Sequence, residues 1–187
     1  MKRRYSASVR AVVEYALMGG DLTAAGSIRK MREGTAGHLA RQGALEGAQI
    51  EYPLRVQIET ERCELLVSGR IDALYERGGA PVIEEIKLFS GEEREAPLPA
   101  HRAQAVVYAY MLNVPAAVVR VAYVRADGQE IAAFEELMTR GEICRAFFSL
   151  LMPYVDKIER EAAWRAVRDE SLAALQFPYG AWRGEQR

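Results

Sequence analysis

The chain has 187 residues, of which 50% are hydrophobic and 27% are charged, and its formal net charge at pH 7 is −1. This length and composition predict one globular domain with a substantial core. A charge so close to neutral excludes a protein whose whole surface binds nucleic acid non-specifically, so any contact with DNA must be local or helped by another domain. No run approaches the ~20 apolar residues of a membrane span, so no membrane partner is expected.

The first 20 residues superficially resemble a signal peptide, because basic residues precede an apolar stretch. Glu14 interrupts that stretch, and its apolar residues recur at helical spacing from Val9 to Leu17. We therefore expect an amphipathic helix here and a cytoplasmic protein. The two cysteines, Cys63 and Cys144, are too few and too far apart for a zinc or iron–sulfur motif, and they make no disulfide framework.

Hydrophobic periodicity and turn signals predict a mixed α/β domain over residues 1–170, followed by a tail over 171–187. Within it we expect N-terminal helices in 1–45, a sheet with one helix in 46–138, and a long helix in 139–170. The expected strands are 49–60, 64–75, 81–89, 116–124 and 130–137, and the later helices are 29–45, 100–112 and 139–168.

Glycines mark three points in this order of elements. Arg77-Gly78-Gly79 and Asp127-Gly128 are hairpin signals between successive strands. Gly34 and Gly37 lie inside the second expected helix, where glycine lowers helix stability. We therefore expect another segment to approach the backbone of that helix closely.

The strand over residues 82–89 carries charges in an apolar setting. Side chains alternate along a strand, so Glu85 and Lys87 share one face while Glu84 points to the other. Burying these two charges costs free energy unless they are paired or bind a metal. The preceding strand is an antiparallel neighbour that brings Asp72 close to Glu85, and two converging carboxylates favour Mg²⁺ or Mn²⁺ over Zn²⁺.

Lys87 stands out because the chain has 21 arginines and only 4 lysines. A lysine beside a metal can orient or deprotonate water and stabilise charge on a phosphate, whereas arginine stays protonated. A Glu-x-Lys pair by itself is more often a solvated strand face with a cross-strand partner. The neighbouring motifs are what favour chemistry here.

Four short motifs occur in order along the chain: Gly34-Thr35-Ala36-Gly37-His38, Gly69-Arg70-Ile71-Asp72, Glu85-Ile86-Lys87 and Gln104-Ala105-Val106-Val107-Tyr108. They resemble the G-x-x-x-H, G-x-x-D, (D/E)-x-K and Q-x-x-x-Y motifs of RecB-like nucleases of the PD-(D/E)XK superfamily. The resemblance covers roughly residues 30 to 110. It implies a restriction-endonuclease-like α/β core, with a mixed central β-sheet flanked by helices, and a Mg²⁺- or Mn²⁺-dependent deoxyribonuclease.

The resemblance also implies roles for individual residues. The implied metal ligands are the side chains of His38, Asp72 and Glu85 and the backbone carbonyl of Ile86. The implied catalytic residues are Asp72, Glu85, Lys87, Gln104 and Tyr108. Members of the family with an iron–sulfur cluster need four cysteines, so no cluster is expected in a chain with two.

Several of these residues also have interpretations without catalysis. Gln104 and Tyr108, at i and i+4, share a helix face and could form an ordinary polar edge. A lone histidine such as His38 is usually structural or exposed. Arg70 and Arg102 flank the motifs as candidate phosphate contacts, although salt bridges to carboxylates are the default.

Two further residues near the motifs receive minor roles. Glu51 opens the first strand at a position that is often acidic in such nucleases, and we expect only support from it. His101 precedes Gln104 and has no motif role, so we expect it on the surface or on the side facing DNA.

The last residues, from Phe177 to Arg187, place an aromatic-Pro-aromatic group ahead of Arg and Gln. This stretch resembles the beginning of a DinG-like or XPD-like helicase core, in which such a Gln contacts the adenine of ATP. The alternative is an ordinary tail that carries a tryptophan. The resemblance implies that the chain is the N-terminal nuclease part of a longer helicase, whose motor would bring the DNA.

The leading expectation is therefore a metal-dependent nuclease that hydrolyses phosphodiester bonds in single-stranded or flap DNA, working with a helicase domain in the same polypeptide. One alternative is a nuclease-fold module that binds DNA or scaffolds a helicase without cutting. A weaker alternative is an α/β protein-interaction domain in which the Glu-x-Lys strand is only a charged face.

Overall fold

The computed structural model describes residues 2–17, 28–89, 91 and 95–174 of the chain, and side chains are described in the second helix from residue 35. The chain divides into two compact units, Met1–Tyr154 and Val155–Arg187. The elements in order are β1 (Arg3–Ser8), α1 (Val9–Ala16), α2 (Ile28–Gly43), β2 (Gln49–Glu59), β3 (Cys63–Arg77), β4 (Ala80–Leu88), α3 (Pro99–Leu112), β5 (Ala116–Val124), β6 (Glu130–Thr139) and α4 (Arg140–Ala173).

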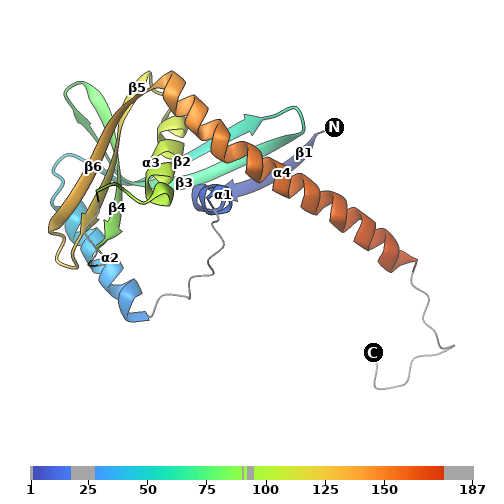
Figure 1. Cartoon of the computed structure of the whole chain (residues 1–187). Helices are drawn as coiled ribbons and strands as arrows, with labels where there is room; N and C mark the ends of the chain where they lie inside the picture. Colours follow the sequence, from blue (N-terminus) through green and yellow to red (C-terminus); the bar gives the residue numbers. More distant parts are fainter. Residues whose placement is uncertain (1, 18–27, 90, 92–94, 175–187) are drawn as a thin grey trace. The chain divides into compact units, whose positions relative to one another are not determined.

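The described strands form one six-stranded mixed sheet (Figure 1). Its order is β1-β3-β4-β5-β6. Strand β2 lies outside this order and pairs with β3 along the edge opposite to that used by β1 and β4. The β1–β3 and β4–β5 pairs are parallel, and the remaining pairs are antiparallel. A mixed sheet flanked by helices confirms the expected α/β fold and is consistent with a restriction-endonuclease-like core.

The long strand β3 changes partner along one of its edges. Strand β2 pairs with one edge over residues 64–74. Along the opposite edge, β1 pairs with residues 63–68 and β4 pairs with residues 73–77. Among the described strands, none pairs with residues 69–72 on that edge. The G-x-x-D motif therefore occupies a gap in the sheet where backbone groups and side chains are available for other contacts.

Helices α2 and α3 cover opposite faces of the sheet. Ile83 of β4 belongs to a buried core that includes Val106 of α3. Glu84 is the next residue along β4, so its side chain points to the other face, where Arg41 of α2 hydrogen-bonds to it. One face of β4 thus contributes Ile83 to an apolar core, and the other face makes a polar contact with α2.

The N-terminal strand differs from the expectation that residues 1–45 contain only helices. β1 was missed because it is short and its alternation is weak, with Tyr5 partly buried and Ala7 as its one buried side chain. Its backbone pairing with β3 decides its conformation. Helix α1 then begins at Val9, with the Ser8 hydroxyl accepting a hydrogen bond from the Ala11 N–H at 3.1 Å.

The expected glycine positions agree with the structure. Gly78, Gly79 and Gly128 have positive φ angles in the two hairpin turns. A Cβ at Gly37 would clash with the carbonyl oxygen of Arg125, so another backbone does approach α2 closely there. In the described residues, no helix is long and apolar enough to cross a membrane.

Candidate metal centre

Three side chains from three separate elements converge beside the gap in the sheet. His38 comes from α2, Glu51 from β2 and Asp72 from β3, and one potential ligand atom of each lies within 4.8 Å of the others. The His38 Nε2 atom lies 2.9 Å from Asp72 Oδ2, and His38 Nδ1 lies 3.9 Å from Glu51 Oε1. Histidine nitrogens and carboxylate oxygens of this kind are the atoms by which proteins coordinate a single divalent cation.

Asp72 is held by the backbone of the neighbouring strand. Its Oδ2 atom accepts a hydrogen bond from the Ile86 N–H at 2.8 Å. The β3–β4 ladder ends at the Ala73–Glu84 pair, next to this contact. The Asp72 carboxylate therefore accepts a hydrogen bond from the backbone of β4 at the point where backbone pairing between β3 and β4 ends.

Glu51 reaches the centre through an unusual backbone conformation. Its neighbours Ile50 and Tyr52 pair with Ala73 and Ile71, which places Glu51 opposite Asp72. The φ angle of Glu51 is 52°, a left-handed value that is uncommon for a residue other than glycine. Such strain persists where the surrounding structure imposes it, and it concentrates at functional sites. The sequence motifs imply only a supporting part for Glu51, because no local pattern reveals a positive φ angle at a glutamate.

Gln42 ties two of these acidic residues to α2. Its side-chain amide donates to the Asp72 carbonyl oxygen at 2.9 Å and to Glu51 Oε1 at 3.2 Å. Gln42 lies one helical turn after His38, so both side chains leave α2 toward the same part of the sheet. It was not among the predicted site residues, and its i+4 spacing from His38 is the signal by which it could have been found.

Glu85 and Lys87 form an ion pair on one face of β4, as strand parity predicts. Lys87 Nζ lies 2.5 Å from Glu85 Oε1. The Glu85 side chain is 5% exposed, and that of Lys87 is 29% exposed. Glu85 does not belong to the tight group formed by His38, Glu51 and Asp72. The structure thus separates three converging donors from an adjoining acid–lysine pair.

The electrostatics of the centre show how closely these groups lie. Burial, and then the negative charge of Asp72, raise the pKa of Glu85 to about 7. The hydrogen bond to Asp72 raises the pKa of His38 above its ordinary value, despite partial burial. Both shifts favour protonated side chains when no cation is bound. The acidic groups thus create a site that attracts positive charge.

Tyr108 of α3 packs into the gap in β3. Burial raises the pKa of its hydroxyl, as do the charges of Glu85 and Asp72. The hydroxyl also makes a hydrogen bond with the backbone of Arg70, within the stretch that lacks a strand partner. Gln104 lies one turn earlier on α3 and is partly buried, and in the described residues its side chain makes no hydrogen bond to the centre. Of these two residues, Tyr108 is the one that the described contacts bring to the acidic residues.

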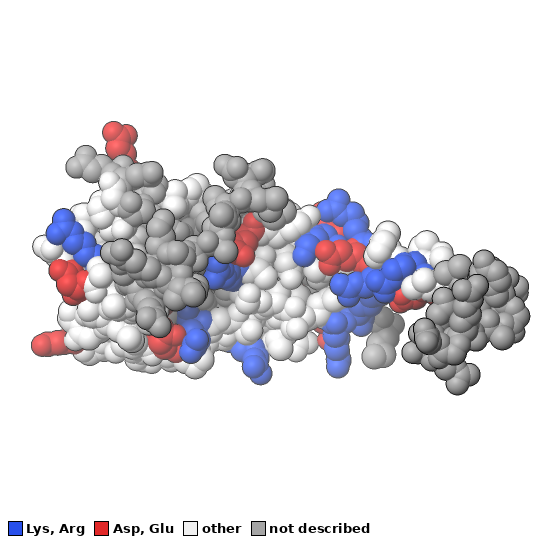
Figure 2. All heavy atoms as spheres, turned by 90° about the horizontal axis from the view of Figure 1, so that it is seen from below, with Lys and Arg blue, Asp and Glu red and all other residues white. Residues whose placement is uncertain are grey.

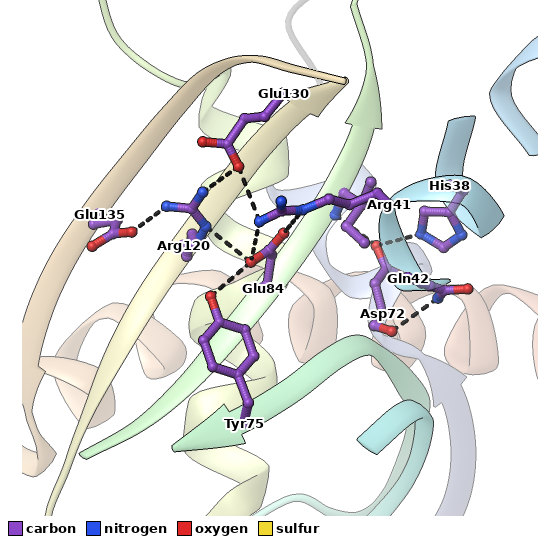
Figure 3. A network of polar contacts seen from close by, with 10 residues as sticks. His38, Arg41, Gln42, Asp72, Tyr75, Glu84, Arg120, Glu130 and Glu135 are labelled. Carbon is purple, nitrogen blue, oxygen red and sulfur yellow. Dashed lines mark hydrogen bonds and ion pairs between the residues drawn. The ribbon is translucent and has the colours of Figure 1, made fainter. Parts of the chain in front are cut away.

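A second polar group, which we call the Glu84 cluster, lies on the opposite face of β4 (Figure 3). Glu84 is fully buried. Its carboxylate accepts hydrogen bonds from Arg41 Nε at 2.8 Å, from the Tyr75 hydroxyl at 2.8 Å and from Arg120 Nε at 2.9 Å. Ion pairs extend the group to acidic residues of β6 and to one more arginine. Its members are Arg41, Tyr75, Arg77, Glu84, Arg120, Glu130 and Glu135.

The flanking basic residues lie in salt bridges or beside the centre. Arg102 forms a salt bridge with Glu136 of β6 at 2.5 Å, as the default interpretation of its sequence position predicts. The Arg70 side chain is 68% exposed, and its Nε atom lies 3.4 Å from Glu51 Oε2, at the edge of the centre. His101 contacts the Tyr123 hydroxyl at 3.0 Å and is partly buried. Figure 2 shows acidic and basic side chains interspersed over the face that it draws.

The donor set fits a hard divalent cation. Metal–oxygen distances of about 2.0–2.6 Å place ligand atoms on opposite sides of one ion roughly 4–5 Å apart. The ligand atoms of His38, Glu51 and Asp72 lie within 4.8 Å of one another, so a single ion can contact all three. Two carboxylates and one imidazole offer oxygen and nitrogen ligands that a divalent cation can use.

Comparisons with known proteins bear on the fold alone. No protein-family model matches the chain, and no curated protein matches its sequence. Among solved structures, the crystal structure of SSO0001 is similar, with a TM-score of 0.53 and 20% sequence identity. The similarity covers 79% of this chain and 75% of that chain. It supports the arrangement of sheet and helices described above.

Proposed function

We propose that this chain is a Mg²⁺- or Mn²⁺-dependent nuclease of the RecB-like, PD-(D/E)XK type, which hydrolyses phosphodiester bonds in DNA. The observation that carries the proposal is the convergence of His38, Glu51 and Asp72 beside the Glu85–Lys87 pair. These residues come from four elements and meet where the sheet has a gap. Apart from Glu51, they are the residues that the motif resemblance selects.

Each residue has a distinct part in the proposed reaction. His38, Glu51 and Asp72 hold the cation, with Glu85 and the Ile86 carbonyl as further ligands. A bound cation would polarise the phosphate and lower the pKa of a water molecule. Lys87 orients that water for attack and stabilises the charge that develops on the phosphate. Tyr108 and Gln104 position the substrate from α3.

The wider setting is part of the same proposal. Residues 177–187, which resemble the beginning of a DinG-like or XPD-like helicase core, lie outside the described residues. A helicase domain in the same polypeptide would supply single-stranded or flap DNA to the nuclease. This setting also accounts for a surface of mixed charge, because the motor would supply most of the DNA affinity. We place this activity in the cytoplasm.

Cleavage assays test the proposal directly. The protein is incubated with labelled single-stranded, double-stranded and flap DNA, with Mn²⁺ or with EDTA. We expect cleavage that requires Mn²⁺, and we expect Lys87→Ala to lower the rate by about 10²-fold or more, the usual contribution of a positioned proton-transfer group. The matched control is Lys2→Ala, which removes a lysine that pairs with Glu59. Equal cleavage by the wild type and Lys87→Ala would rule the assignment out.

One observation favours a second candidate, a nuclease-fold module that binds DNA or scaffolds a helicase without cutting. The charges of the centre are already paired internally, through His38 with Asp72 and Lys87 with Glu85. Calorimetry with Mn²⁺ separates the two candidates. A folded protein that binds no Mn²⁺ supports the inactive module, whereas binding that Asp72→Asn abolishes supports the nuclease.

A further inference from the structure

We propose that Arg41 is a positioning residue for the metal centre, which anchors helix α2 to Glu84 and so sets the place of His38. This inference rests on the proposed function, because it assigns a purpose to the Glu84 cluster through the ligand that α2 carries. Arg41 itself lies on the far face of β4 from Glu85. It acts on the site only through the helix that it shares with His38.

The first argument is that α2 buries little apolar surface over residues 35–43, where its side chains are described. In this stretch only Gly37 and Gln42 are buried. Leu39 is 62% exposed. A surface helix is ordinarily held by an apolar stripe that faces the core. That stripe is missing from residues 35–43, so polar contacts help to position this part of α2.

The second argument is that two polar contacts hold the turn directly after His38. Arg41 Nε donates to Glu84 Oε1 at 2.8 Å, and its Nη2 lies 3.0 Å from Glu130 Oε2. Gln42 binds the other side, through the Asp72 carbonyl oxygen. Figure 3 shows Arg41 and Gln42 reaching toward different strands from the helix that carries His38. The turn is therefore fixed from two directions.

The third argument concerns the strand to which Arg41 is anchored. Glu84 precedes Glu85, so the contact joins the helix that carries His38 to the strand that carries the acid–lysine pair. Gly37 also packs against the Arg125 backbone, which leaves α2 no room to approach the sheet further. A guanidinium fork suits this task because it reaches two carboxylates in fixed geometry.

The fourth argument separates positioning from stability. The Glu84 cluster contains three glutamates and three arginines, so its formal charges balance without a cation. Buried ion pairs contribute little net stability compared with apolar packing, because desolvation offsets their attraction. What such a cluster does supply is a defined orientation. Removing a side chain that orients a metal ligand, without binding the metal itself, typically lowers metal affinity by about 10–100-fold.

The test measures the Mn²⁺ affinity of the whole folded chain by electron paramagnetic resonance of free Mn²⁺. We expect Arg41→Met to weaken binding about tenfold. In a His38→Ala background the same substitution should have almost no effect, because the ligand that it positions is gone. Arg41→Lys should give an intermediate loss, since an ammonium cannot reproduce the fork.

Two controls distinguish positioning from general loss of stability. Arg77→Met removes another arginine of the Glu84 cluster, which pairs with Glu135 and makes no described contact with α2, and it should leave Mn²⁺ affinity unchanged. Unfolding by urea, measured for every variant, shows the folded fraction, and Arg41→Lys replaces Arg41→Met if the latter does not fold. Wild-type affinity in the folded Arg41 variants would overturn the inference, as would an equal loss in the His38→Ala background. Failure of the wild type to bind Mn²⁺ would instead overturn the proposed function, and this inference with it.

Discussion

The Tyr108 ring lies directly against the backbone of Gly69. A Cβ at residue 69 would lie 2.7 Å from Tyr108 Cε1, 2.9 Å from its hydroxyl oxygen and 2.9 Å from Val9 Cγ2. Two motifs that are separate in sequence are therefore complementary in space, with a glycine in one leaving room for a tyrosine in the other. This contact also places the tyrosine hydroxyl beside the Arg70 backbone in the gap of β3.

We expect Gly69→Ala to lower the free energy of unfolding by about 1–3 kcal/mol, the usual effect of overpacking a filled site. The rigid Tyr108 ring cannot move aside without losing its backbone hydrogen bond. The measurement is urea unfolding followed by circular dichroism. Gly43→Ala is the control, because a Cβ there meets nothing within 4 Å and should not destabilise. A Gly69→Ala protein as stable as the wild type would show that the ring adapts.

A second prediction concerns Gly37, where a Cβ would clash with the Arg125 carbonyl oxygen and lie 3.3 Å from the Ala126 Cα. Because both neighbours are backbone, Gly37→Ala should push α2 away from the sheet and displace His38. We expect a loss of about 1–3 kcal/mol in stability and weaker Mn²⁺ binding. Gly141→Ala, in the first turn of α4 with open space around it, should be neutral or stabilising. Unchanged Mn²⁺ affinity in Gly37→Ala would contradict the displacement of His38.

A third prediction concerns Glu51, the acidic residue to which the sequence motifs assign only a supporting role. Since Glu51 lies in the tight donor group with His38 and Asp72, Glu51→Gln should weaken Mn²⁺ binding by more than tenfold, in the range seen for groups that hold or orient a metal. Calorimetry measures this change. The matched control, Glu76→Gln, alters an exposed acid near the end of β3 and should leave the affinity unchanged. Equal affinities in Glu51→Gln and the wild type would remove Glu51 from the site.

The fourth prediction is a pH dependence of the metal-free protein. The pKa of Glu85 rises from 4.5 to about 7 on folding, so the folded protein holds a proton that the unfolded chain has released between these values. Stability therefore falls as the pH rises through this window. The pKa of His38 is raised above 6.5, so its contribution is present below that value and is lost as the pH rises through the folded pKa. Both effects have the same sign.

We accordingly expect the protein in EDTA to be more stable at pH 5.5 than at pH 8, and Mn²⁺ affinity to rise over the same range, because protons compete with the cation. Carboxyls with lowered pKa, such as Glu135, act only below about pH 4.5 and do not disturb this window. Urea unfolding at the two pH values measures the effect, with Glu85→Gln as the variant in which it should shrink. A stability that rises from pH 5.5 to pH 8 would contradict the shift assigned to Glu85.

Much of the local structure could be read from the sequence because its signals act over a few residues. The β5 strand has the expected bounds, Ala116–Val124, and the hairpin glycines have the expected positive φ angles. Strand parity alone separated Glu85 from Glu84, and the structure pairs the first with Lys87 and buries the second in the Glu84 cluster. Periodicity and turn chemistry are properties of neighbouring residues, so the chain itself determines them.

Other features depend on contacts between distant segments, and only the tertiary structure decided them. β1 is a strand because β3 offers it a free edge, although its own residues carry only a weak strand pattern. Glu51 joins the centre because pairing with β3 places it opposite Asp72 with a left-handed backbone. Sequence motifs nevertheless identified most residues of the proposed metal centre. The position of His38, by contrast, depends on Arg41 and Glu84, which lie 43 residues apart in the chain and are brought together by the sheet.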